Sequence, residues 1–119
     1  MFKEALRDVV ENTEGGQAAL LMGFDGIAVD SYVREGSEVG IEVIGMELSV
    51  LLKGLMHAVE AVEAGGAQEL AIQAEKLTII VRILNRDYFL GLAMGPDGNY
   101  GKGRFLLRLA SPKLLSALE

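Results

Sequence analysis

One long segment of this sequence is apolar around most of a helix. From residue 41 to residue 62, large apolar side chains recur every three or four positions, the spacing of one helix face; they are Ile41, Ile44, Leu48, Leu51, Leu52, Leu55, Val59 and Val62. Val43, Met46, Val50 and Met56 fall outside that stripe. A helix that is apolar on two sides is buried on two sides. Because the chain has only 119 residues, we expect the second side to face another subunit.

Five other segments predict strands, each bounded by turn residues. The first two flank the turn Phe24-Asp25-Gly26, and the last three are separated by short turns at 75–76 and 85–87; the strands span residues 17–22, 27–33, 69–74, 77–84 and 88–94. Such short connections require antiparallel neighbours in a sheet.

Two more helices are predicted, one near each end of the sequence. Residues 2–12 place apolar and charged side chains on opposite sides, and Asn12 followed by Gly15-Gly16 ends this helix. Between these two helices, Gly65-Gly66 predicts the end of the long apolar helix described above. The last helix begins near Lys102, and Pro112 predicts a kink or a fresh start with Ser111 as the N-cap.

The fourth predicted strand is apolar on both faces, with Leu77, Ile79, Val81 and Ile83 on one and Ile80 and Leu84 on the other. Both sheet faces therefore need a helical cover. The predicted fold is α/β in the α+β sense, a three-layer α/β/α sandwich around a five-stranded antiparallel sheet. Its element order is α-β-β-α-β-β-β-α, with the long helix on one face, the other two helices on the opposite face, and one domain over residues 1–119.

The formal charge of −6 argues against a role in nucleic-acid binding, because a phosphate backbone requires a positive face. The basic residues cluster only at Lys102, Arg104, Arg108 and Lys113, which a solvated helix face explains as well as a ligand does. No apolar run is long enough to span a bilayer, and the N-terminus lacks the pattern of a secretory signal. We therefore expect no membrane insertion and a cytoplasmic location.

Residues 94–105, MGPDGNYGKGRF, hold five glycines and a lysine and raise the question of a phosphate loop. A Walker loop has four residues between its first glycine and its Gly-Lys pair, followed by Ser or Thr. Here Gly95 and Gly101 enclose five residues, and Gly103 stands where the hydroxyl belongs. Pro96-Asp97-Gly98 is turn chemistry with Pro at the second position, so a turn is the favoured interpretation.

No other arrangement in the sequence indicates catalysis, a cofactor or a metal. His57 is the only histidine, and Glu60 is its one carboxylate neighbour at helical spacing, which is too few ligands for a metal. The serines lie in no nucleophile elbow, and cysteine is absent. We therefore predict no catalytic, cofactor-binding or metal-binding residues.

Gly54 lies in the middle of the long predicted helix. A glycine there costs about 0.5–1 kcal/mol relative to alanine. Two interpretations stay open: the helix tolerates the cost, or another backbone approaches closely at this position.

The element order and several local patterns resemble the Roadblock/LC7 family. The matching stretches are LLMGFDGIAVDSY with its Gly-Phe-Asp-Gly turn, the long helix rich in Leu, Ala and Met, the strand pair ELAIQAEKLTIIVRIL, and the ending YFLGLAMGPDGNYGKGRFLLRLA. The ending is the most specific, and together these stretches span nearly the whole chain.

The resemblance implies a dimer, either of two identical chains or with another Roadblock protein. In this family, sheets join edge to edge through the third strand, and the long helices pair across the interface. The dimer-interface residues implied for this chain are Val43, Met46, Val50, Leu51, Leu70 and Ile72.

The chain resembles bacterial stand-alone members of the polarity-regulator type, which bind a small Ras-like GTPase without supplying a catalytic arginine. The resemblance therefore implies a non-catalytic adaptor that modulates the cycle or location of such a GTPase. The implied GTPase-binding residues are Val50, Lys53, Gly54 and His57.

Two alternatives remain beside the adaptor. Profilin-like and longin-like domains also combine a sheet with flanking helices, so a small-molecule sensor or a pure scaffold is the second interpretation. That interpretation needs a cavity between sheet and helix, whereas apolar residues at nearly every inward position predict a filled core. The third is an enzyme that uses the glycine stretch to bind nucleotide.

Overall fold

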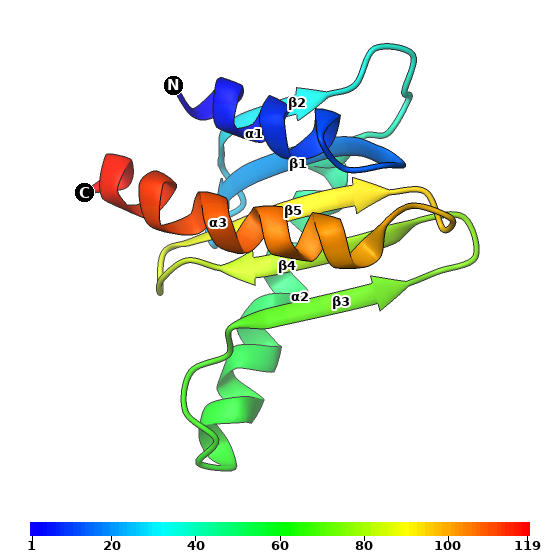
Figure 1. Cartoon of the computed structure of the whole chain (residues 1–119). Helices are drawn as coiled ribbons and strands as arrows, with labels where there is room; N and C mark the ends of the chain where they lie inside the picture. Colours follow the sequence, from blue (N-terminus) through cyan, green and yellow to red (C-terminus); the bar gives the residue numbers. More distant parts are fainter.

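The computed structural model describes all of residues 1–119 and confirms the predicted element order (Figure 1). The elements are α1 (Phe2–Glu11), β1 (Gly16–Gly23), β2 (Ala28–Val33), α2 (Ile41–Ala61), β3 (Glu69–Gln73), β4 (Thr78–Ile83), β5 (Tyr88–Met94) and α3 (Tyr100–Leu118). The five strands form one antiparallel sheet in the order β2-β1-β5-β4-β3, so β2 and β3 are its edges.

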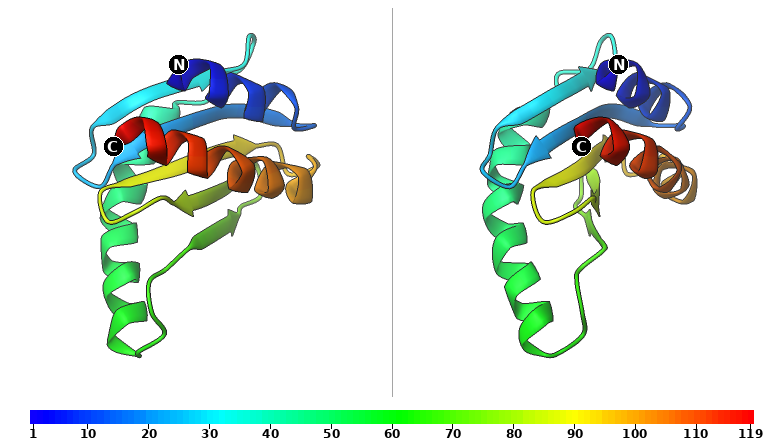
Figure 2. Two further views of the ribbon diagram at one scale, coloured as in Figure 1. Left: turned by 60° about the vertical axis from the view of Figure 1, so that its left-hand side comes forward. Right: turned by 90° about the vertical axis from the view of Figure 1, so that its left-hand side faces the viewer.

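Two apolar layers sandwich this sheet because its central strands bury both faces. Neighbouring residues on a strand point to opposite sides, so Phe89 packs toward α2 whereas Leu90 packs toward α1 and α3. Ile80 and Val81 divide in the same way on β4. The predicted three-layer sandwich is therefore confirmed, with α2 alone on one face and α1 with α3 on the other (Figure 2).

The glycine stretch between β5 and α3 is a turn packed against the α1–β1 connection. The Gly98 N–H donates to the Gly95 carbonyl at 3.0 Å and closes a turn with Pro96 at its second position, as predicted. The Gly95 N–H donates to the Gly15 carbonyl at 2.9 Å, and the Asn99 N–H to that of Glu14 at 2.8 Å. These backbone donors are engaged within the chain, which supports the turn over the phosphate loop.

The two ends of α3 differ from their sequence prediction. The helix begins at Tyr100, two residues before Lys102, because the Asn99 side chain accepts the Lys102 N–H at 3.0 Å and caps the first turn. The predicted fresh start at Ser111 is wrong. Its hydroxyl donates to the Leu107 carbonyl at 2.7 Å, and the helix runs through Pro112 to Leu118. Buried residues on either side of Pro112 keep this segment on the sheet; they are Ala110 and Leu114.

α2 ends at Ala61, earlier than the predicted stop at Gly65-Gly66. The chain leaves the helix at Glu63, whose φ of 59° is left-handed and breaks the helical path before the glycines are reached. The last turns of α2 project past the sheet edge formed by β3, and residues 62–68 lead back to that edge (Figures 1 and 2). None of the helices combines the length and apolar character required to cross a membrane.

Candidate functional site

The outward side of α2 is apolar and open. Leu48 and Leu52 are buried against the sheet. By contrast, the four α2 residues predicted for a dimer interface are each between 51% and 72% exposed; they are Val43, Met46, Val50 and Leu51. The structure therefore separates the two apolar sides found in the sequence: one packs on the sheet and the other is more than half exposed.

The remaining two predicted interface residues lie on β3, one of the two edge strands of the sheet. Leu70 and Ile72 are half-buried and pack against the same core as α2. One side of β3 pairs with β4, and its other side has no strand partner. An unpaired edge presents a row of backbone donors and acceptors to a further strand.

Leu51 lies on one flank of α2, between the side packed on the sheet and the outward side. Glu42 marks the opposite flank, because its carboxylate accepts a hydrogen bond from the Ser31 hydroxyl of β2 at 3.2 Å. Nine residues at 100° each place Leu51 on the reverse side of the helix from Glu42. We call Val43, Met46, Val50, Leu51, Leu70 and Ile72 the pairing surface.

The residues predicted to bind a GTPase, Val50, Lys53, Gly54 and His57, are all exposed on α2. Lys53 and His57 line a hollow of about 280 Å³ that the sequence did not indicate. Its other walls come from α2 and from two turns at one end of the sheet; they are Phe24, Met56, Glu60 and Arg86. The structure thus adds an aromatic ring and a guanidinium to the predicted α2 residues.

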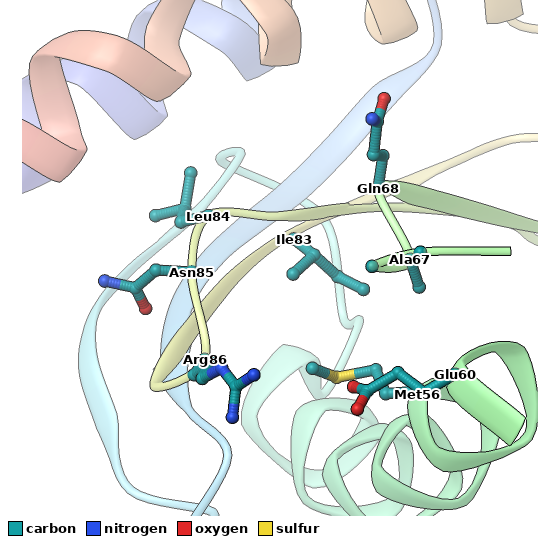
Figure 3. Close-up of a pocket in the computed structure, with 10 residues that line it drawn as sticks. Met56, Glu60, Ala67, Gln68, Ile83, Leu84, Asn85 and Arg86 are labelled. Carbon is teal, nitrogen blue, oxygen red and sulfur yellow. The ribbon is translucent and has the colours of Figure 1, made fainter. Parts of the chain in front are cut away.

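Arg86 also borders a second hollow, of about 590 Å³, between the end of α2 and the β4–β5 turn (Figure 3). Figure 3 shows Met56 and Glu60 on the α2 side and Ile83 with Arg86 on the sheet side. Glu60 and Arg86 form no ion pair with each other. This open and mixed lining fits contact with a protein better than an enclosed small-molecule site.

No three His, Asp or Glu side chains lie close enough together to hold a metal ion. The serine in the middle of α2 is also engaged: the Ser49 hydroxyl is buried and donates to the Met46 carbonyl at 2.7 Å. The outward side of α2 therefore offers apolar side chains, the side chains of Lys53 and His57, and exposed backbone at Gly54.

Gly54→Ala is expected to raise the free energy of unfolding by about 0.5–1 kcal/mol, because alanine favours the helix by that amount. A β-carbon at Gly54 meets nothing within 4 Å, so no clash opposes the gain. Urea denaturation of the two proteins measures the difference.

Gly45→Ala is the matched control on the same helix. There the added carbon would collide with Leu20 Cδ2 and lie 2.9 Å from Met22 Sδ, both in the core, so stability should fall. A loss of stability from Gly54→Ala would indicate that the backbone of another chain approaches this glycine, because nothing within the chain does.

Several solved structures share this architecture. No protein-family model and no curated protein matches the chain. Among solved structures, the crystal structure of MglC from Myxococcus xanthus is 38% identical over 98% of each chain, with a TM-score of 0.71. The Roadblock/LC7 domain from Streptomyces avermitilis has a TM-score of 0.86 at 11% identity, covering 98% of this chain and 96% of that one. The gliding protein MglB from Thermus thermophilus has a TM-score of 0.85 at 17% identity, over 95% of this chain and 84% of that chain.

Proposed function

The chain belongs to the Roadblock/LC7 family, and from that premise we propose that it is a non-catalytic adaptor that pairs with a second Roadblock chain and binds a small Ras-like GTPase. The observation that carries this proposal is the open outward side of α2, where exposed apolar residues adjoin Lys53 and His57. Large apolar side chains grouped on one exposed helix face mark a protein contact.

Pairing with a second copy uses two features at once. The unpartnered edge of β3 accepts the β3 strand of the second chain, which extends the sheet across the pair. Leu51, Leu70 and Ile72 then lie near the seam, where the helix and the edge strand leave apolar surface uncovered. Because such a two-fold contact uses the same surface on both chains, each residue contributes twice. A different Roadblock chain with a matching edge fits the same geometry.

The GTPase contacts the part of α2 that the pair leaves accessible, with Lys53 and His57 at its centre. Phe24 and Arg86 extend that area onto the sheet turns. Arg86 is exposed, and arginine is among the residues that dominate protein interfaces, whereas Phe24 is 6% exposed and packs on Phe89 beneath the hollow. The adaptor binds through these side chains and controls the cycle or location of its partner, while the hydrolytic residues belong to the GTPase.

Lys53→Glu is expected to weaken GTPase binding at least tenfold, because it reverses a charge at the centre of the contact. The partner for this test is a small Ras-like GTPase purified from the same organism and loaded with GDP or with a non-hydrolysable GTP analogue. Isothermal titration calorimetry measures both states, and the affinity should depend on the nucleotide.

Lys76→Glu is the control, since it makes the same charge change in the exposed β3–β4 turn, away from α2. Equal affinity for the Lys53 variant and the unaltered protein would place the contact elsewhere. Absence of binding in both nucleotide states would refute the GTPase proposal, and it would leave pairing to be judged by molecular mass alone.

A further inference from the structure

α3 has a charge unlike the rest of the chain. It holds four of the 11 Lys and Arg residues and none of the 17 Asp and Glu residues; the four are Lys102, Arg104, Arg108 and Lys113. The protein as a whole carries a net charge of −6. A cationic helix on an acidic protein creates a local field that attracts acidic partners.

Two large apolar side chains lie among these cations on the outer side of α3. Phe105 is 51% exposed and Leu109 is 56% exposed, one helical turn apart. The inner side of the helix packs on the sheet through Gly103, Leu107, Ala110 and Leu114. Lys102 precedes Phe105 by three residues, the exposed Arg108 follows Phe105 by three, and Lys113 follows Leu109 by four, so all five lie toward the outer side. We call Lys102, Phe105, Arg108, Leu109 and Lys113 the α3 strip.

Helix stability does not explain these cations. The positive end of the helix dipole lies at the first turn, where acidic residues are favoured, yet the first turn of α3 has none and carries Lys102. Arg104 has its own structural role: it donates to the Glu69 carboxylate of β3 at 2.6 Å, a contact that raises the pKa of the guanidinium. Lys102, Arg108 and Lys113 form no ion pair in the chain.

We propose that the α3 strip docks an acidic amphipathic segment of a second protein, whose carboxylates face the three unpaired cations and whose apolar side chains cover Phe105 and Leu109. From Lys102 to Lys113 the strip is about 16 Å long at 1.5 Å per residue, which suits a helix of about three turns. Charge complementarity selects this occupant. An anionic membrane would repel the acidic remainder of the chain, and two apolar side chains give it little to insert.

This surface is separate from the one proposed for the GTPase. α2 and α3 lie in opposite layers of the sandwich (Figure 2), so both surfaces can be occupied at once. The adaptor would then bridge two different partners across its sheet. Docking at α3 does not depend on GTPase binding by α2.

The test uses a fluorescein-labelled amphipathic helix made of Glu, Leu and Ala as the probe, titrated with the full chain and followed by fluorescence anisotropy. Arg108→Glu and Leu109→Ser should each weaken binding at least tenfold, and binding should fall as salt increases. Lys76→Glu and Ile27→Ser are the matched controls, because both residues are exposed and lie off α3. A probe with Lys in place of Glu should not bind.

Thermal unfolding establishes that each variant is folded before it is titrated. The proposal would be overturned if the controls weakened probe binding as much as the α3 variants do. It would also be overturned if Val50→Asp abolished probe binding while the α3 variants did not. Two other results would also overturn it by naming a different occupant. One is α3-dependent binding to vesicles containing phosphatidylserine but not to the probe, and the other is an α3-dependent change in the protein's own mass.

Discussion

Val50→Asp is expected to separate the proposed pair of chains into monomers. Val50 is 72% exposed on the outward side of α2, between Met46 and Gly54 along the helix. In a two-fold pair the substitution places two carboxylates in an apolar contact, where unpaired charge is costly. A loss of about 1.4 kcal/mol at each copy raises the dissociation constant of the pair about 100-fold. Size-exclusion chromatography with light scattering, run over a range of concentrations, measures the change in mass.

The same variant should remain folded, because Val50 contributes little to the core of its own chain. Far-ultraviolet circular dichroism checks this. Ile27→Asp is the matched control: Ile27 is 67% exposed, lies in the β1–β2 connection and belongs to no proposed contact. Its mass should equal that of the unaltered protein. The proposal that chains pair through the pairing surface would be contradicted if the unaltered protein were monomeric at every concentration. It would also be contradicted if the Val50 variant still paired.

The fold was predictable because the burial pattern is strong in the central elements. Residues 77–84 are apolar on both faces, and this alone required a helical layer on each side of the sheet. The boundaries were less predictable. Asn99 begins α3 through one side-chain hydrogen bond, and Glu63 ends α2 through a left-handed φ. Neither changes the apolar periodicity from which the helices were predicted.

The candidate site was predictable only where it lies on one helix. The spacing along α2 places Val50, Lys53 and His57 on one side, and the structure agrees. Phe24 and Arg86 could not be added from spacing, because they belong to turns separated by more than half of the chain. The pairing of Gly23 with Tyr88 across β1 and β5 brings those turns together, and the Phe24 N–H donates to the Asp87 carbonyl at 2.9 Å.

The sequence did not reveal that exposed apolar side chains lie among the cations of α3. A solvated face explains Lys102 and Lys113 until the structure places Phe105 and Leu109 beside them on the outer side of the helix. Periodicity alone allows those apolar residues to lie in the core. Their exposure is decided by Gly103 and Leu107, which contact the sheet instead.

Gly15→Ala is expected to lower the free energy of unfolding by about 2–5 kcal/mol, the sum of two penalties. Gly15 has a φ of +83°, which disfavours any residue with a β-carbon. The added carbon would also lie 2.6 Å from the Gly98 Cα, where two backbones meet and no side chain can move aside. Urea denaturation in the Val50→Asp background measures this loss without the contribution of pairing.

Gly36→Ala separates the two penalties. Gly36 has a similar φ of +89°, but a β-carbon there meets nothing within 4 Å. Only the conformational penalty of about 1–2 kcal/mol remains, so the difference between the variants isolates the contact of Gly15 with Gly98. Equal losses would mean that this contact adds nothing to stability. The glycines of residues 94–105 would then need another explanation, and anion binding at the start of α3 would be the first to test.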